Sequence, residues 1–296
     1  MEEQPRKKDL LFIINPISGI GKQKNIEELI REFTDTSIFD YTVKFTKGPG
    51  HGTELANEAV ASGVDVVVAI GGDGTVNEIG QALVGSEIAL GIIPTGSGNG
   101  LARHLKIPFS FEKAIDVINH CKIRKIDTAT INGQIFLSIA GVGYDAFVAK
   151  KFASAPKRGF FTYFRIVSNE YPQYQPKKYI LEIDGKIIRR KALSITFANS
   201  NQFGNNTSID PQAKLDDGLI DVCIVRRIPL WLVPFYVPML FFKTFHKTHY
   251  IEIIRAKKAI VTRKKGKTIH LDGDPLKTGK VLEMKVNPLS LNIIVP

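Results

Sequence analysis

The first hundred residues contain three copies of one pattern, in which a short apolar run leads into a glycine-rich loop and then a helix signature. The apolar runs span 10–14, 64–70 and 88–93, and the loops that follow them span 15–21, 71–75 and 94–100. Continuous apolar strands that alternate with helices predict a parallel sheet covered on both faces. Strand-to-helix loops of such a sheet emerge at one edge, so the three loops are predicted to converge on one site.

After about residue 125 the pattern changes to two-residue periodicity with hairpin turns, as at Asn132-Gly133 and Asp184-Gly185. We therefore expect an α/β domain over 1–125 and a mainly antiparallel β-sandwich domain over 126–287. The last strand, 290–295, fits either domain, so 288–296 could complete the first. Other expected strands of the second domain span 193–198, 220–225, 250–254, 259–262, 268–271 and 281–286.

Charge is distributed unevenly. The chain carries a net charge of +11, and residues 126–296 hold 26 basic and 13 acidic residues, a net of +13. A basic surface attracts anionic lipid headgroups or nucleic acid. The two cysteines are isolated and the first eight residues do not resemble a secretory leader, which predicts a cytoplasmic protein. The longest apolar run, 228–242, contains three prolines and is too short to span a bilayer.

The Gly71-Gly72-Asp73-Gly74-Thr75 loop is the strongest chemical signal. Consecutive glycines can present backbone N–H groups to a phosphate, and a following helix adds its positive end. Asp73 would repel phosphate oxygens, so it implies either a bridging Mg2+ or a hydrogen-bonding duty to other groups. A plain strand-to-helix turn capped by Asp73 is the alternative. None of the three loops has the Walker or the Rossmann spacing.

Three motifs together carry a resemblance to a known family. They are Asn15-Pro16-Ile17-Ser18-Gly19, then 71–78, and then Pro94-Thr95-Gly96-Ser97-Gly98-Asn99 followed by Leu101-Ala102-Arg103. In this order they resemble the diacylglycerol kinase catalytic-domain family, which includes soluble bacterial diacylglycerol kinases, YegS-like lipid kinases, and sphingosine and ceramide kinases. The resemblance runs from about Leu10 to the end. It implies a phosphofructokinase- and NAD-kinase-like α/β domain, a β-sandwich domain, and ATP in the cleft between them.

The resemblance also implies the ligands of ATP and Mg2+. Residues similar to the family's nucleotide contacts are Asn15, Pro16, Ser18, Gly19, Thr46, Gly71, Gly72, Asp73, Gly74, Thr75, Asn77, Glu78, Thr95, Gly96, Ser97 and Asn99. His51 either joins them or has a capping role at the start of a helix. Magnesium would be held by the backbone of Lys214 and Leu219 and the side chain of Asp217, although a solvated turn explains the same residues.

The Leu271-Asp272-Gly273-Asp274-Pro275 segment is the candidate catalytic element. Phosphate transfer to an alcohol needs a carboxylate near the attacking hydroxyl, but this pattern also fits a plain hairpin. The family carries Asp-Gly-Glu here, and its final acid, the usual proton acceptor, corresponds to Asp274. Because Asp is one methylene shorter than Glu, Asp272 and Asp73 remain alternative bases.

Two further segments bear on the lipid. By resemblance, Asp145 in Gly141-Val142-Gly143-Tyr144-Asp145 and Arg103 would contact the acceptor; an exposed acid at a bulged strand end is the alternative for Asp145. The aromatic stretch 231–236, with Phe241 and Phe242, is either a lipid-facing lip or the core of a short helix. Arg226, Arg227, Lys243 and Lys247 flank it.

We therefore predict a cytoplasmic, peripherally membrane-associated lipid kinase. It would use ATP and Mg2+ to phosphorylate a hydroxyl of a diacylglycerol-like or sphingoid-like lipid at an anionic membrane surface, with no nucleic acid as partner. Gly100 stands where bacterial diacylglycerol kinases usually have Asp, which leaves the acceptor open. An NAD kinase-like enzyme and a non-catalytic nucleotide-binding module are the alternatives. A second copy of the chain, in a homodimer, is a further candidate partner.

Overall fold

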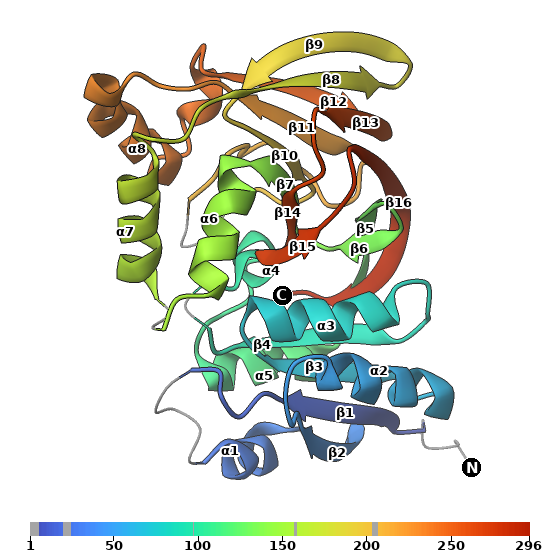
Figure 1. The fold of residues 1–296 in the computed structure, drawn as a ribbon. Coiled ribbons are helices and arrows are strands. Elements are labelled where there is room, and N and C mark those ends of the chain that lie inside the picture. The colour runs from blue at the N-terminus through green and yellow to red at the C-terminus, as the bar shows by residue number, and fades with distance from the viewer. Residues whose placement is uncertain (1–5, 20–24, 97, 157–158, 203–206) are drawn as a thin grey trace. The chain divides into compact units, whose positions relative to one another are not determined.

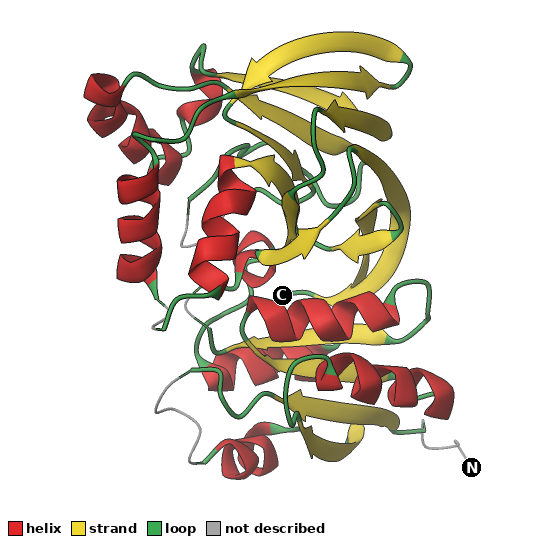
Figure 2. Cartoon of the chain, viewed as in Figure 1, coloured by secondary structure: helices red, strands yellow, loops and turns green. Residues whose placement is uncertain are grey.

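The computed structural model describes residues 6–19, 25–96, 98–156, 159–202 and 207–296. The chain divides into two compact units, 1–126 with 289–296 (unit 1) and 127–288 (unit 2). Unit 1 alternates helices with strands, whereas strands dominate unit 2 (Figure 2). Both the expected α/β class of the first part and the antiparallel β class of the second are confirmed.

Unit 1 is built on a parallel sheet in the order β2-β1-β3-β4 (Figure 1). Its elements are β1 (Lys8–Ile14), α1 (Ile26–Phe33), β2 (Phe39–Phe45), α2 (His51–Ser62), β3 (Val66–Gly71), α3 (Asp73–Leu83), β4 (Ala89–Pro94), α4 (Gly100–His104) and α5 (Phe111–His120). Every residue of β3 and β4 is buried. Helices α2 and α3 pack together on one face of the sheet, and α1 and α5 on the other. These crossovers bring the carboxyl ends of β1, β3 and β4 to one edge.

Unit 2 contains two antiparallel arrays of strands. Its strands are β5 (Ile123–Ile131), β6 (Gln134–Phe136), β7 (Ile139–Gly143), β8 (Lys177–Ile183), β9 (Lys186–Ala192), β10 (Ser194–Ala198), β11 (Ile220–Val225), β12 (Ile251–Ala256), β13 (Lys258–Arg263), β14 (Thr268–Leu271) and β15 (Asp274–Lys277). One array has the order β12-β11-β10-β7-β14-β15; in the other, β13, β8 and β9 are joined in succession. A shared apolar core includes Phe136, Tyr179, Phe197 and Ile269, which come from both arrays.

Helices occupy two insertions of unit 2 that the strand pattern does not predict. These elements are α6 (Tyr144–Ala153), α7 (Phe160–Glu170), the 3-10 turn η1 (Leu230–Leu232), α8 (Val233–Phe241) and the 3-10 turn η2 (Phe245–Lys247). Helix α6 follows β7 directly, so Asp145 is buried in the first turn of a helix, and the alternative of an exposed acid at a bulged strand end is wrong. Among the described residues, no helix has the length and apolar character needed to cross a bilayer.

The two strands expected near the carboxyl terminus are one element, β16 (Val281–Ile294). Its first part pairs antiparallel with β13 of unit 2. Its last part pairs parallel with β4 of unit 1, where Asn292 lies opposite Ala89. Leu289, at the point where the chain passes between the units, has a φ of 45°. The carboxyl-terminal residues thus complete the sheet of unit 1.

Candidate active site

Side-chain hydrogen bonds tie the first glycine loop to the other two loops of unit 1. The Asn15 Nδ2 group donates to Thr75 Oγ1 at 2.9 Å. The hydroxyl groups of Ser18 and Thr95 are 3.0 Å apart. Because β1, β3 and β4 are neighbours in the sheet, their following loops are close enough for these contacts. The three loops therefore lie side by side, and their short polar side chains face one another.

Asp73 links the second loop to the third. Its two carboxylate oxygens accept the N–H groups of Asn99 at 2.8 Å and Gly100 at 2.6 Å. In return, Asn99 Nδ2 donates to the carbonyl of Gly71 at 3.0 Å. Of the two explanations for an acid in a phosphate-type loop, these contacts support the hydrogen-bonding duty. Asp73 holds the third loop against the start of α3.

Glycine is needed where these loops touch. A Cβ on Gly96 would lie 2.7 Å from the Cα of Gly72, and a Cβ on Gly71 would lie 2.4 Å from the Thr75 side chain. At Gly74, in the first turn of α3, a Cβ would meet nothing within 4 Å. The first-turn N–H groups of a helix have no acceptor inside the helix and favour anions. Accessible amides beside hydroxyl groups fit the phosphate chain of a nucleotide.

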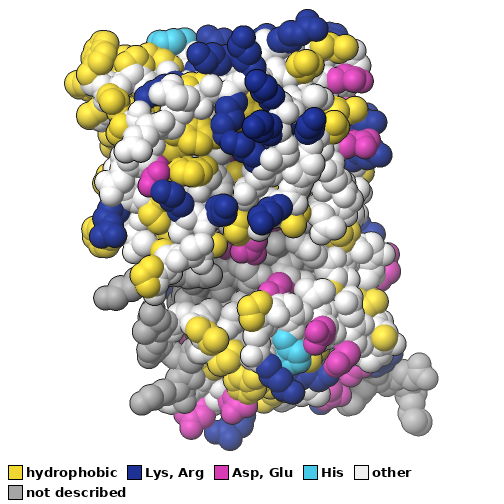
Figure 3. Space-filling model, in the orientation of Figure 1, with side chains coloured by type: hydrophobic (Ala, Val, Ile, Leu, Met, Phe, Trp, Pro, Cys, Tyr) yellow, Lys and Arg dark blue, Asp and Glu magenta, His cyan; other side chains and the backbone are white. Residues whose placement is uncertain are grey.

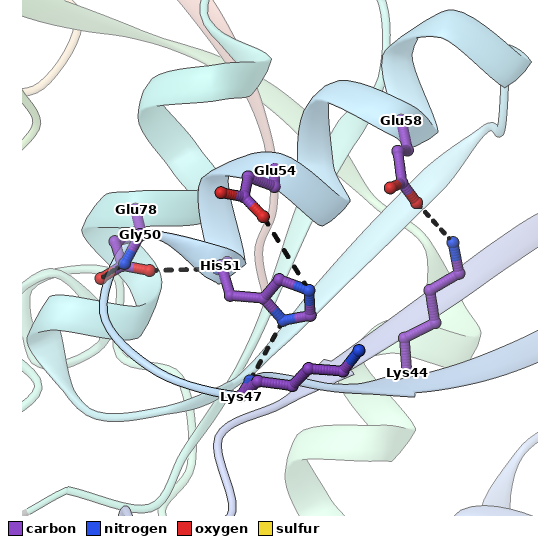
Figure 4. Close-up of polar contacts among 8 residues, drawn as sticks. Lys44, Lys47, Gly50, His51, Glu54, Glu58 and Glu78 are labelled. Carbon is purple, nitrogen blue, oxygen red and sulfur yellow. Dashed lines mark hydrogen bonds and ion pairs between the residues drawn. The ribbon is translucent and has the colours of Figure 1, made fainter.

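Glu78, a predicted nucleotide contact, also binds backbone N–H groups at the start of α2 (Figure 4). Its carboxylate accepts the N–H groups of Gly50 at 3.0 Å and Gly52 at 3.2 Å. The ring of His51 accepts the Lys47 N–H through Nδ1 at 3.1 Å. This contact supports the capping interpretation of His51. Glu78 and His51 both order the loop that leads into α2.

The remaining predicted residues of unit 1 differ in their surroundings. Thr46 and Asn77 are buried, and Pro16 is exposed. Arg103 donates through Nε to the carbonyl of Gly98 at 2.8 Å, and its guanidinium lies over the Phe109 ring at 4.2 Å from the centroid. Arg103 therefore helps to hold the third loop in place through its bond to Gly98. Ser97 lies outside the described residues.

The candidate catalytic segment of unit 2 is a hairpin between β14 and β15. Asp272 and Gly273 both have positive φ, 47° and 95°, as a type I′ turn requires. The Asp272 carboxylate accepts three N–H groups, from Leu137 at 2.7 Å and from Ser138 and Ile139 at 2.8 Å each. Burial outweighs these bonds and raises the pKa of Asp272 to about 6. Asp274, in contrast, is exposed.

A buried polar row lies next to this hairpin. Gly141, on β7, is directly opposite Thr196 of β10 and His270 of β14. The Asp145 carboxylate accepts the Thr196 hydroxyl at 3.0 Å and lies 3.5 Å from His270 Nε2. A Cβ on Gly141 would come within 2.1 Å of that carboxylate, so only glycine leaves it room. The buried carboxylate is thus already engaged, which favours a positioning role for Asp145 over contact with an acceptor.

His270 is a residue that the sequence pattern does not single out. Its Nδ1 atom accepts the Gly273 N–H at 3.4 Å, so the ring connects Asp145 to the acid hairpin. An Nδ1 that accepts leaves the proton on Nε2, which then faces the Asp145 carboxylate. In the sequence His270 is only one residue of a strand. Its position two residues before Asp272 is the single signal that could have pointed to it.

The predicted magnesium turn is anchored by a second residue that sequence reasoning missed. The buried carboxylate of Asp127 accepts the Gly218 N–H at 2.7 Å, and the Asp127 N–H donates to the Leu215 carbonyl at 2.5 Å. Asp217 accepts the Leu219 N–H at 3.1 Å. The described residues include no group of three His, Cys, Asp or Glu side chains placed to hold a metal. The oxygen donors here suit a hard cation only if main-chain carbonyls and water complete the set.

Known proteins resemble both units. Residues 9–131 match the family described as the diacylglycerol kinase catalytic domain, and residues 138–295 match the YegS C-terminal NAD kinase β-sandwich-like domain. The diacylglycerol kinase of Bacillus subtilis is 31% identical over 226 residues, which cover 74% of each chain. That of Staphylococcus aureus strain RF122 is 31% identical over 231 residues, 75% of this chain and 71% of its own.

Solved structures give the same fold. The crystal structure of a diacylglycerol kinase from Bacillus anthracis superposes with a TM-score of 0.77 at 23% sequence identity. The match covers 98% of this chain and 97% of the other. The likeness therefore extends over both units.

Proposed function

Because the chain belongs to the diacylglycerol kinase family, we propose that it is a lipid kinase that transfers the γ-phosphate of ATP to a lipid hydroxyl. The observation that carries this proposal is the hydrogen-bonded cluster of three glycine loops around the start of α3. Such a cluster offers backbone N–H groups and hydroxyls to a polyphosphate. The residues that would hold ATP are those already named in the three loops, together with Thr46 and Glu78.

In unit 2 we assign the proton acceptor to Asp274. It is the exposed carboxylate of its hairpin and corresponds to the usual proton acceptor of the family, whereas Asp272 is half-buried. A general base must reach the hydroxyl whose proton it accepts, so an exposed acid suits the task better than an enclosed one. Asp272 and Asp73 then act by positioning the hairpin and the third loop.

Magnesium would be held by the Asp217 side chain and the main-chain carbonyls of Lys214 and Leu219. When bound, Mg2+ neutralises negative charge on the phosphates. Asp127 would keep this turn in shape through its bond to Gly218. In unit 2 we place the acceptor beside the hairpin that Asp145 helps to position, with the lipid presented by an anionic membrane surface that the +13 net charge of residues 126–296 favours.

The test is a transfer assay with labelled ATP, Mg2+ and a panel of lipids in mixed micelles that includes diacylglycerol, sphingosine and ceramide. We expect at least one lipid to be labelled, and removal of Mg2+ by a chelator to stop the reaction. Labelling of NAD without any labelled lipid would replace this proposal with an NAD kinase. Nucleotide binding without any labelled product would replace it with a binding module.

A further inference from the structure

The apolar segment 228–242 contains the 3-10 turn η1 and the helix α8, and the two faces of this pair have different surroundings. One face packs on a buried cluster of unit 2 that includes Ile228, Phe245 and Ile251. The inward residues, which recur at helical spacing, are Leu232, Val233, Tyr236, Met239 and Leu240. Core packing therefore explains half of the segment. The other half needs a separate explanation.

The outward face is apolar as well. Trp231, Phe235 and Phe242 are 73%, 71% and 76% exposed, and Leu230 beside them is 51% exposed. The spacing of four and seven residues puts the three aromatic side chains on one side of η1 and α8. Figure 3 shows hydrophobic side chains gathered at the upper left, where Figure 1 draws α8. A surface helix normally turns polar residues outward, so an outward face of this kind indicates a partner.

The charge around this face is mainly positive. From Val222 to Ile251 the chain contains no Asp or Glu, but it contains Arg226, Arg227, Lys243 and Lys247. Lys243 and Lys247 follow the helix and are exposed, and Arg226 before it is 53% exposed at its side chain and lies 3.9 Å from the Glu252 carboxylate. Lys and Arg groups border the apolar patch in Figure 3. Its rim is thus positive on both sides of the helix.

Hydrogen bonds to the end of α7 hold the base of the segment. The Tyr171 hydroxyl accepts the Ile228 N–H and donates to the Ile228 carbonyl, both at 2.8 Å. Arg227 donates to the Gln175 side chain and the Pro172 carbonyl at 2.9 Å each. These bonds fix the direction in which the segment leaves β11. The exposed aromatic face is therefore a built feature of unit 2.

We propose that this outward face, made of Leu230, Trp231, Phe235 and Phe242 with Lys243 and Lys247 at its rim, docks unit 2 on an anionic lipid bilayer. The inference rests on the proposed lipid kinase function and names the surface that meets the membrane. Trp and Phe partition into the interfacial region of a bilayer, and neighbouring cations attract anionic headgroups. A bilayer can bury the aromatic face and pair its anionic headgroups with Lys243 and Lys247, and it is where the lipid acceptor resides.

The experiment is sedimentation of the full chain with vesicles of phosphatidylcholine alone or mixed with phosphatidylglycerol. The triple variant Trp231→Ala, Phe235→Ala, Phe242→Ala should bind mixed vesicles at least about tenfold more weakly, because each lost side chain removes apolar burial. Lys243→Gln with Lys247→Gln should weaken binding to mixed vesicles by about fivefold per charge and leave neutral vesicles unaffected. A matched control is Ile187→Ala with Val281→Ala, two exposed apolar residues of unit 2 that should not matter.

Three outcomes would overturn the proposal. One is unchanged vesicle binding by the triple variant. Another is an equal loss in the Ile187 and Val281 control. The third is a wild type that is a dimer and a triple variant that is a monomer, with equal vesicle binding by both. The face would then join two copies of the chain.

Failure of the kinase function would look different. With a short-chain acceptor dispersed as monomers, the triple variant should label as fast as the wild type, because no docking is needed. If the wild type labels no lipid but binds vesicles, and the triple variant does not bind them, the kinase function is refuted. The docking surface would then still stand.

Discussion

The hairpins at Asp184-Gly185 and Asp272-Gly273 have the same two turn residues and a similar turn backbone. The φ values are 44° and 84° in the first and 47° and 95° in the second, so both are type I′ turns. Asp184 is exposed and accepts the N–H groups of Lys257 and Lys258. Asp272 is half-buried and accepts three N–H groups. An Asp-Gly pair therefore determines the turn, and the neighbouring chain determines what its carboxylate does.

The largest difference between the hairpins should lie in the residue after glycine, which is Asp274 in one and Lys186 in the other. Asp274→Asn removes the proton acceptor, so we expect transfer to the lipid to fall by about 10²–10⁴-fold. Nucleotide binding, measured by calorimetry, should be unchanged. Lys186→Ala, the matched change, should leave the rate as it is.

Asp274→Glu refines this test, because it keeps a carboxylate with a longer reach. It should retain more activity than Asp274→Asn. If Asp274→Asn transfers phosphate at the wild-type rate, the exposed acid is not the base, and the two hairpins are functionally alike.

The next difference is in stability. Asp272→Ala leaves three part-buried N–H groups without an acceptor, and each buried group left unsatisfied costs about 1–3 kcal/mol. We expect unfolding to become easier by about 3 kcal/mol or more. Asp184→Ala should cost less than about 1 kcal/mol, since water can replace an exposed acceptor. Urea unfolding followed by circular dichroism measures both, and equal losses would show that the burial of Asp272 is unimportant.

The turns and the parallel strands of this fold could be predicted because each depends on local sequence. Val66–Gly71 and Ala89–Pro94 are buried on both faces, so they read as apolar runs. Phe39–Phe45 was missed because it is an edge strand with mixed exposure. The helices Tyr144–Ala153 and Phe160–Glu170 were missed because they are insertions between strands of a β unit. They are not part of the strand–loop–helix repeat that marks the helices of the first hundred residues.

The candidate site could be predicted only where the chemistry lies in a motif. The glycine loops and the Asp-Gly-Asp segment are contiguous in sequence, and the resemblance supplied their roles. His270 and Asp127 contact residues distant in the chain, Asp145 and Gly218, so they belong to no contiguous motif. The partner of Asp73 is likewise set by the neighbouring strand rather than by its own loop.

A third test uses the titration of Asp272. Its pKa is raised from 3.8 to about 6 by burial, so the folded state binds this proton more tightly than the unfolded state does. The contribution of this proton to the free energy of unfolding is fully present below about pH 4 and is lost as the pH rises through about 6. The change is at most about 3 kcal/mol. Asp272→Asn cannot titrate, so its unfolding free energy should fall less between these pH values. A steeper fall in the variant would mean that the three N–H bonds outweigh burial.

The smallest expected effect concerns the residue two positions before each turn, His270 in one hairpin and the exposed Glu182 in the other. His270 bridges the Gly273 N–H and the Asp145 carboxylate, so it should keep the acid hairpin in register. His270→Gln should lower kcat about tenfold, since small displacements of a catalytic group are costly, while the KM for ATP stays constant. Glu182→Gln should change neither. If His270→Gln lowers only the stability and the kcat per folded molecule is unchanged, the ring is a packing residue and the two hairpins differ in Asp274 alone.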